Sequence, residues 1–209
     1  MLRESRAETV PLSASLWSVV RAVTVALAVT GLAACASNPI PTFDLSAPTQ
    51  FTAKGGGSGQ LVVVMPTALA ALDTEKILVE PAPGQISYLS DAQWADRLPP
   101  LLQARTIQAF ENGSRLSRVA RPGDGISGDY QLNMDIRTFG VRIEPSGALA
   151  VVEISAKVID NQAGRIVAAR IFSARVPISS VTGPAVAQAL DEASDQVLID
   201  MVRWAAPRF

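Results

Sequence analysis

The sequence contains no histidine and only one cysteine, Cys35. These absences exclude a histidine-based catalytic triad, an intramolecular disulfide and a zinc site built from thiolates and imidazoles. Lysine is also scarce: after Cys35 the chain carries Lys54, Lys76 and Lys157, and none follows a serine at Ser-x-x-Lys spacing. We also find no calcium-loop or nucleotide-binding motif. The sequence therefore predicts no catalytic residues, no metal and no cofactor.

Net charge is also low. Without residues 1–34, which contain three arginines and two glutamates, 15 basic side chains face 17 acidic ones, a formal charge of −2. A nucleic-acid-binding protein would be expected to carry a strongly basic surface. We therefore expect no nucleic-acid partner.

A long apolar run is confined to the N-terminal region. After Arg21 come thirteen uncharged residues, 22–34. As a helix they would span about 20 Å, too short for a hydrocarbon core of about 30 Å. Residues 1–34 therefore read as a cleaved export signal, although Glu4 and Glu8 are unusual there and leave open a translation start nearer Arg21.

Cys35 follows directly after this apolar run. The segment Leu32-Ala33-Ala34-Cys35 resembles the lipobox of bacterial lipoproteins. The resemblance implies cleavage between Ala34 and Cys35, a diacylglyceryl group on the thiol and an acyl chain on the new amino group. Two or three acyl chains anchor a protein firmly, whereas one gives only marginal binding. The alternative is a free thiol near the end of an ordinary signal peptide or of a short anchor helix. By the same resemblance, Ala36 and Ser37, in place of an aspartate, favour the outer over the inner membrane.

The next region is rich in Ser, Pro, Thr and Gly. We expect residues 35–59 to form a lipidated, flexible tether, with the run KGGGSG at 54–59 as a linker rather than a phosphate-binding loop, because a P-loop follows a strand and opens a helix. Residues 60–209 are then the folded domain.

Alternating and amphipathic patterns predict the elements of this domain. Residues 130–137 and 152–158 alternate apolar with polar side chains, as half-buried strands do. With residues 165–178, and a turn at 160–164, they predict an antiparallel meander. Shorter strands are expected within 60–66, 76–81, 85–90 and 114–121.

Two helices are expected. One lies between an N-cap at Ser90 or Asp91 and a stop at Gly113, with Pro99 and Pro100 in its first turn or in a break before it. It would bury Leu98, Leu102, Thr106, Ala109 and Phe110, with Leu101 and Ile107 off this stripe. The second begins at Pro184 and buries Val186, Leu190, Ala193, Val197, Met201 and Trp204.

Together these elements predict an α/β fold of the α+β kind. A largely antiparallel mixed sheet would carry the two main helices on one face, as a two-layer sandwich. Asp191 and Asp195 form an i, i+4 carboxylate pair that we assign to the solvated face of the second helix.

Two features could serve an interface. Trp94 precedes the first helix, where a large aromatic is either a hydrophobic staple or an interface anchor. Arg115, Arg118 and Arg121 form a short basic run that would either bind an anionic partner or keep an edge strand soluble.

The order and spacing of several segments resemble the ABC-type transport auxiliary lipoprotein family, found with mammalian-cell-entry (MCE) lipid transport systems. The segments are FDLSAP, LVVVMPTALAALDTEKILV, the stretch around Trp94 from ISYLSD to LSRV, ARIFSARVPI and the Ala-rich helix ending at Trp204. The resemblance covers nearly all of residues 42–206.

The resemblance implies a non-enzymatic, periplasm-facing lipoprotein of the cell envelope, anchored to the membrane by its lipid. Its partners would be an MCE-domain subunit and, through it, an ABC permease and an ATPase. The alternative is an outer-membrane scaffold or assembly factor for another envelope complex.

Overall fold

The computed structural model describes residues 39–53, 59–114 and 118–209. Within them, residues Ile40–Phe209 form one compact unit. The strands are β1 (Thr42–Phe43), β2 (Leu61–Val63), β3 (Thr67–Ala68), β4 (Lys76–Glu80), β5 (Ser87–Trp94), β6 (Val119–Ala120), β7 (Tyr130–Glu144), β8 (Gly147–Asp160) and β9 (Arg165–Ile178). The helices are α2 (Leu98–Gly113) and α3 (Gly183–Ala205), with a short 3₁₀ turn at Ala206–Arg208.

The long strand β7 organises the mixed sheet. Along one edge it pairs antiparallel with β8, which pairs antiparallel with β9. Along its other edge lie β2, β3 and β4 in succession, all parallel to it. β5 and then β1 extend the sheet beyond β4, and β6 flanks β2. The expected meander of three long strands is confirmed.

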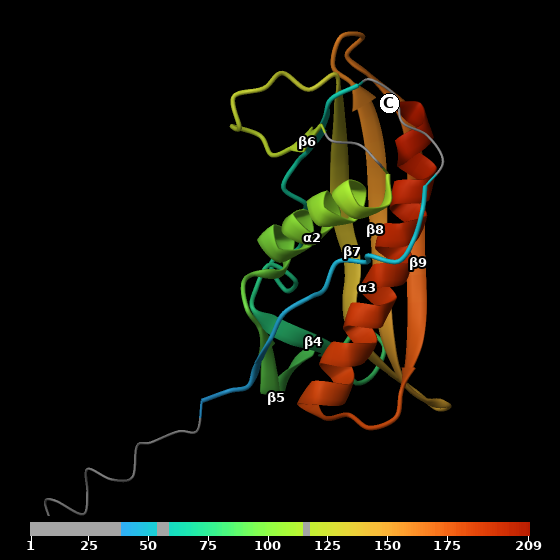
Figure 1. The fold of residues 1–209 in the computed structure, drawn as a ribbon. Helices are drawn as coiled ribbons and strands as arrows, with labels where there is room; N and C mark the ends of the chain where they lie inside the picture. The colour runs from blue at the N-terminus through green and yellow to red at the C-terminus, as the bar shows by residue number, and fades with distance from the viewer. Residues whose placement is uncertain (1–38, 54–58, 115–117) are drawn as a thin grey trace, which may run out of the picture. The chain divides into compact units, whose positions relative to one another are not determined.

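Both helices cover the same face of this sheet (Figure 1). The apolar members of the alternating strands point to that face and are fully buried, among them Leu132, Ile136, Val152, Ile154 and Val158. The two-layer α+β fold is therefore confirmed. The opposite face carries the polar members of the same alternation.

Helix α3 follows its sequence pattern. Val186, Leu190, Ala193, Val197 and Met201 are all buried, and Pro184 sits in the first turn. Trp204 is half-buried and meets Phe172 of β9 edge to face at 5.4 Å. This stripe attaches α3 to β8 and β9.

Helix α2 begins later than predicted. The N-cap at Ser90 or Asp91 is wrong: residues up to Trp94 continue β5, and Arg97 precedes the helix. β5 continues to Trp94 because β1 pairs with it there, with Phe43 opposite Trp94. The prolines occupy the first turn as expected, and Leu101 and Ile107 are buried too, so the apolar face is wider than the predicted stripe.

The expected tether is largely packed. Residues 40–53, which we call the strap, run from β1 across α3 to the end of α2 (Figure 1). The expectation of a flexible segment over 35–59 is therefore wrong for the strap. Local composition gave a misleading signal, because the contacts that fix the strap come from residues distant in sequence.

Candidate functional site

An apolar cavity of about 200 Å³ lies beside the β4–β5 hairpin. Leu72, Leu78 and Phe139 line it, while Leu69 and Ile86 stand at its mouth with exposed fractions of 75% and 58%. Such large exposed apolar side chains around a hollow are typical of binding surfaces. The cavity is therefore the best candidate for a binding site among the described residues.

Trp94 supports the cavity from behind. Its indole is 2% exposed and meets the ring of Phe139 edge to face, with 5.9 Å between ring centroids. The position matches the packing alternative, although the partner lies on β7 rather than in the first turn of α2. Trp94 presents no free surface to a partner and instead holds a cavity-lining ring in place.

An ion pair forms the polar rim of the cavity. Arg142 Nε donates to Glu80 Oε2 at 2.9 Å, and the Gly84 backbone N–H donates to Glu80 Oε1 at 3.4 Å. The hydrogen bond from Arg142 is the main cause that lowers the pKa of Glu80, and the bond from Gly84 adds to it. Glu80 therefore stays ionised and fixes the turn that carries Ile86.

A second hollow, of about 470 Å³, lies near the same ion pair. It is lined by Ala82, Pro83, Ile143 and Pro145 together with Glu80, Arg142 and Glu144. The β4–β5 turn and the β7–β8 turn thus enclose it from two sides. Apolar side chains dominate this end of the sheet.

Residues on both helices hold the strap. Asp44 pairs with Arg105, and Asn112 Nδ2 donates to the Pro48 carbonyl at 3.2 Å. The Ala53 N–H donates to the Gly113 carbonyl at 2.8 Å. Ser46 donates to Asp191 through its N–H at 2.6 Å and its Oγ at 2.8 Å. The apolar positions of TFDLSAP were the one sequence signal for this segment: Leu45 is buried and Phe43 partly so.

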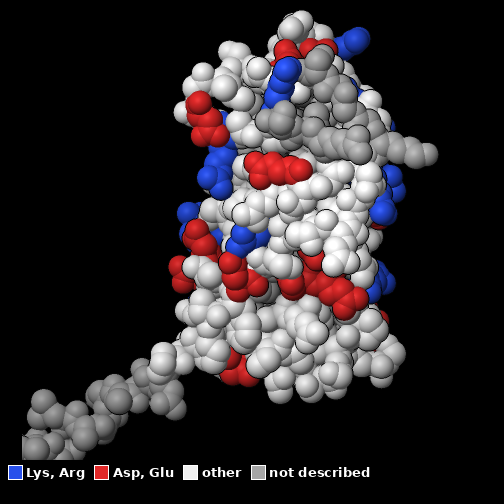
Figure 2. Space-filling model, in the orientation of Figure 1, with Lys and Arg blue, Asp and Glu red and all other residues white. Residues whose placement is uncertain are grey.

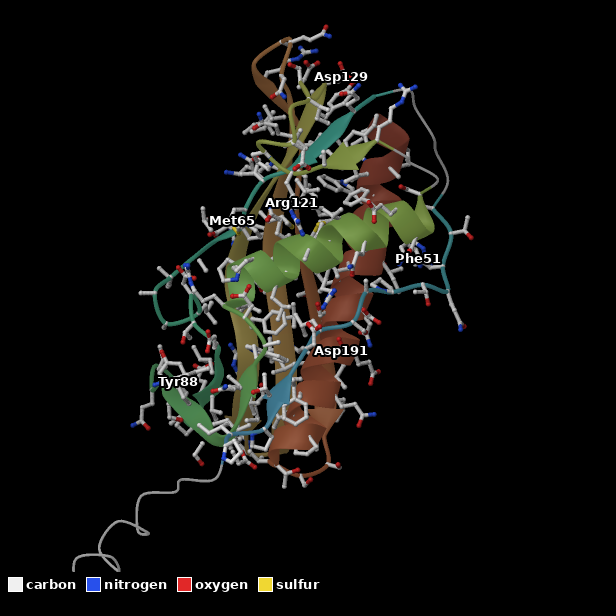
Figure 3. The ribbon with its side chains drawn as sticks, turned by 60° about the vertical axis from the view of Figure 1, so that its left-hand side comes forward. Phe51, Met65, Tyr88, Arg121, Asp129 and Asp191 are labelled. Atoms are coloured by element: carbon white, nitrogen blue, oxygen red, sulfur yellow. The ribbon has the colours of Figure 1, made fainter. Side chains whose placement is uncertain are left out.

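The strap also changes the setting of the carboxylate pair on α3. Asp191 and Asp195 are half-buried, so their assignment to a solvated face is wrong; Figure 3 shows Asp191 beside the strap. Desolvation, followed by repulsion from Asp191, raises the pKa of Asp195 to about 6. Its Oδ1 is buried and has no hydrogen-bond partner within residues 39–53, 59–114 and 118–209.

The basic run is only partly described. Arg115 lies outside the described residues. The Arg118 carbonyl accepts from the Leu61 N–H, and the Arg121 N–H donates to Asp124 Oδ2 at 2.7 Å. Arg121 lines a hollow together with Glu111 and Asp124, so acidic side chains share its surroundings. An anionic partner at Arg115, Arg118 and Arg121 stays a prediction.

The lipobox residues Leu32, Ala33, Ala34 and Cys35 also lie outside the described residues, and their roles stay predictions. In the described part of the chain no cluster of acidic side chains could hold a metal ion. Neither described helix is long and apolar enough to span a bilayer.

Comparison with known proteins identifies the family of this chain. The family model for the ABC-type transport auxiliary lipoprotein component matches residues 43–202. An uncharacterized protein of Bradyrhizobium diazoefficiens is 34% identical over 165 residues, which is 78% of this chain but 44% of that protein. The chain thus spans less than half of this relative.

Solved structures show the same fold. A DUF330-family protein of Xanthomonas campestris superposes with a TM-score of 0.72 at 29% identity, over 79% of this chain and 94% of the other. An uncharacterized protein gives a TM-score of 0.62 at 14% identity, over 80% and 99% of the two chains. With a family model matched across most of its length, the chain belongs to the ABC-type transport auxiliary lipoprotein family.

Proposed function

We propose that this protein is a lipid-anchored, non-catalytic accessory subunit of an ABC transporter that moves lipids between the inner and outer membranes, and that it acts on the periplasmic side. The observation that carries the proposal is the family match over residues 43–202, which begins eight positions after the lipobox cysteine. The sequence has no nucleotide-binding motif, so ATP hydrolysis belongs to a partner ATPase. The present protein contributes binding to the transporter and no catalysis.

The anchor is the lipid on Cys35. Signal cleavage after Ala34 makes Cys35 the first residue, with a diacylglyceryl group on its sulfur and an acyl chain on its amino group. Replacement of the thiol by Cys35→Ala removes the nucleophile that accepts the lipid. We expect this variant to lose the lipid mass from its N-terminal peptide and to leave the membrane fraction.

The apolar cavity is the docking point for the MCE subunit of the transporter. Its volume of about 200 Å³ is below the range of about 300–1,000 Å³ that whole small-molecule ligands occupy. It therefore fits one inserted apolar side chain of a partner, the arrangement found at the centre of protein interfaces.

Affinity purification from detergent-solubilised membranes tests this function. The wild-type protein should recover an MCE subunit with its permease and ATPase. Leu69→Arg places a charge at the mouth of the cavity and should abolish recovery. The control variant Ile166→Arg, at an exposed isoleucine on β9, should recover the MCE subunit as the wild type does. Consistent absence of an MCE subunit from the wild-type eluate would contradict the proposal; an outer-membrane barrel in its place would favour a scaffold role.

A further inference from the structure

One end of the described body has turns without charged side chains. The segments 40–43, 81–90, 145–152 and 176–183 contain no Asp, Glu, Lys or Arg, and we call them together the uncharged end. Strand order brings them together: β4 and β7 run parallel and finish here, β5 and β8 start here, and β9 leads through residues 179–182 into α3. Figure 2 shows few blue or red atoms on the visible surface of this lower end.

The opposite end is charged. Residues 118–129 carry Arg118, Arg121, Asp124 and Asp129, and residues 157–165 carry Lys157, Asp160 and Arg165. Figure 3 shows Asp129 at this end and Tyr88 near the other. The asymmetry therefore follows the long axis of β7 and belongs to the turns rather than to the sheet.

Exposed apolar side chains project from the uncharged end. Ile40 is 47% exposed, Ile86 58% and Val181 47%, and Ile143 borders the β7–β8 turn. Of the charges that border these turns, Glu80 pairs with Arg142, Asp91 Oδ2 accepts the Gly183 N–H at 2.9 Å, and Glu144 at the end of β7 is half-buried. Little charge would have to be desolvated if an apolar medium covered these turns.

The strap leads to this end. β1 runs parallel to β5 with Thr42 opposite Gln93, so residues before Thr42 run toward the start of β5 and the turn at 81–86. Only four residues lie between Cys35 and Ile40, which makes five residue steps, and a chain covers at most about 3.6 Å per residue. A lipid on Cys35 therefore holds Ile40 within about 18 Å of the bilayer surface.

We propose that the uncharged end rests on the bilayer that holds the Cys35 lipid, with Ile40 and Val181 in the interfacial layer. The inference rests on the lipid anchor of the proposed function. Apolar side chains on loops partition into the headgroup and acyl boundary in proportion to the apolar area that they bury. The acyl chains keep the protein at the membrane, and the uncharged end sets its orientation.

Fluorescence quenching on vesicles tests the orientation. The full-length lipidated protein is reconstituted in phosphatidylethanolamine and phosphatidylglycerol vesicles that contain a lipid with a nitroxide headgroup. An environment-sensitive dye is attached to single cysteines, at Gln85→Cys and Ser180→Cys on the uncharged end and at Ile126→Cys and Ala163→Cys on the far end. Lipidation blocks the Cys35 sulfur, so only the new thiol reacts.

We expect quenching several-fold stronger at positions 85 and 180 than at 126 and 163. Two double variants check the cause. Ser146→Asp with Val181→Asp should relieve the quenching at position 85, whereas Ala163→Asp with Ile126→Asp should leave it unchanged. All four replaced residues lie at exposed positions.

Two results would overturn the inference. If mass spectrometry finds the lipid on Cys35 and the vesicles retain the protein, but all four dyes are quenched alike, the orientation is wrong and the anchor stands. If the dye at 180 ignores the lipid and is shielded only by added MCE subunit, the uncharged end is a protein interface. Absence of lipid on Cys35 would instead remove the proposed function itself.

Discussion

At the scale of single residues, Asp195 stands out because its carboxylate is partly desolvated and pairs with no cation among the residues that the structure describes. The sequence predicted its place on α3 but not its environment, because the strap that covers this part of the helix comes from residues 145 positions away. Trp94 gives a similar lesson. Its size made it a candidate for a hydrophobic staple or an interface anchor. Its burial follows from the pairing of β5 with β1, which the sequence did not predict.

The raised pKa of Asp195 makes stability depend on pH. Its pKa is about 6 in the folded chain against an ordinary value of 3.8, so the folded state binds the proton more tightly. The penalty for ionisation is absent below about pH 4 and fully present above about pH 6. We expect Asp195→Asn to raise the free energy of unfolding at pH 7 by about 1 kcal/mol, after allowance for solvent screening.

Urea denaturation at pH 7 and pH 5 measures this effect. The gain in Asp195→Asn should shrink at pH 5, where the wild-type carboxyl is largely protonated. Asp200→Asn, at an exposed position on the same helix, is the control and should change little at either pH. An equal gain at both pH values would show that ionisation of Asp195 is not the cause.

Gly113 is required by close packing rather than by backbone conformation. A Cβ on Gly113 would lie 2.1 Å from the nearest ring atom of Phe51. We expect Gly113→Ala to displace the ring and to lower the free energy of unfolding by about 1–3 kcal/mol, as overpacking does. In the double variant with Phe51→Ala, the alanine at 113 should cost much less than in the wild-type background, as a double-mutant cycle by chemical denaturation would show. Additive costs would mean that the two residues do not contact.

At the scale of elements, periodicity predicted the strands and helices whose formation depends on local sequence. The three strands β7, β8 and β9 and the stripe of α3 follow from alternation and helical spacing. The parallel pairs of β2, β3 and β4 with β7 could not be predicted in this way, because a parallel ladder joins segments far apart in sequence. The strap was missed for the same reason, and the cavity that depends on β4 and β7 was missed with it.

Gly140 permits one of these parallel pairs. A Cβ there would lie 2.5 Å from the carbonyl oxygen of Leu78, a backbone atom that cannot rotate away. We expect Gly140→Ala to separate β4 from β7, to cost about 2–3 kcal/mol and to loosen the cavity between them. Hydrogen exchange should become faster in β4 and β5, while β8 and β9 act as the internal control. Uniform acceleration in all strands would indicate global unfolding instead.

At the scale of the whole molecule, the described body has one end that carries an ordinary mixture of charges and another whose turns carry none. Simple counts, with a formal charge of −1 for the entire chain, conceal this separation. It becomes visible only when the strand order brings segments 40–43, 81–90, 145–152 and 176–183 to the same end. The sequence could have shown that each segment is uncharged, but not that they are neighbours.

This separation predicts a weak salt dependence of membrane contact. Ionic screening weakens attraction between exposed charges, with a Debye length of about 30 Å at 0.01 M and 3 Å at 1 M. Because the uncharged end contacts lipid through apolar side chains, raising the salt concentration across this range should leave the quenching at position 85 unchanged. Loss of quenching at high salt would point to the arginines of the body as the true membrane contact.

The parallel pairing of β1 with β5 has a mechanical consequence. Any pull on the anchor enters the body at Ile40 and acts first along the bond from the Gln93 N–H to the Pro41 carbonyl and along the β1–β5 ladder. It reaches the Asp44–Arg105 pair and the Ser46–Asp191 contacts only after that ladder has opened. The strap would therefore separate from the body in two stages. The first stage pulls on β5, the strand that also borders the apolar cavity.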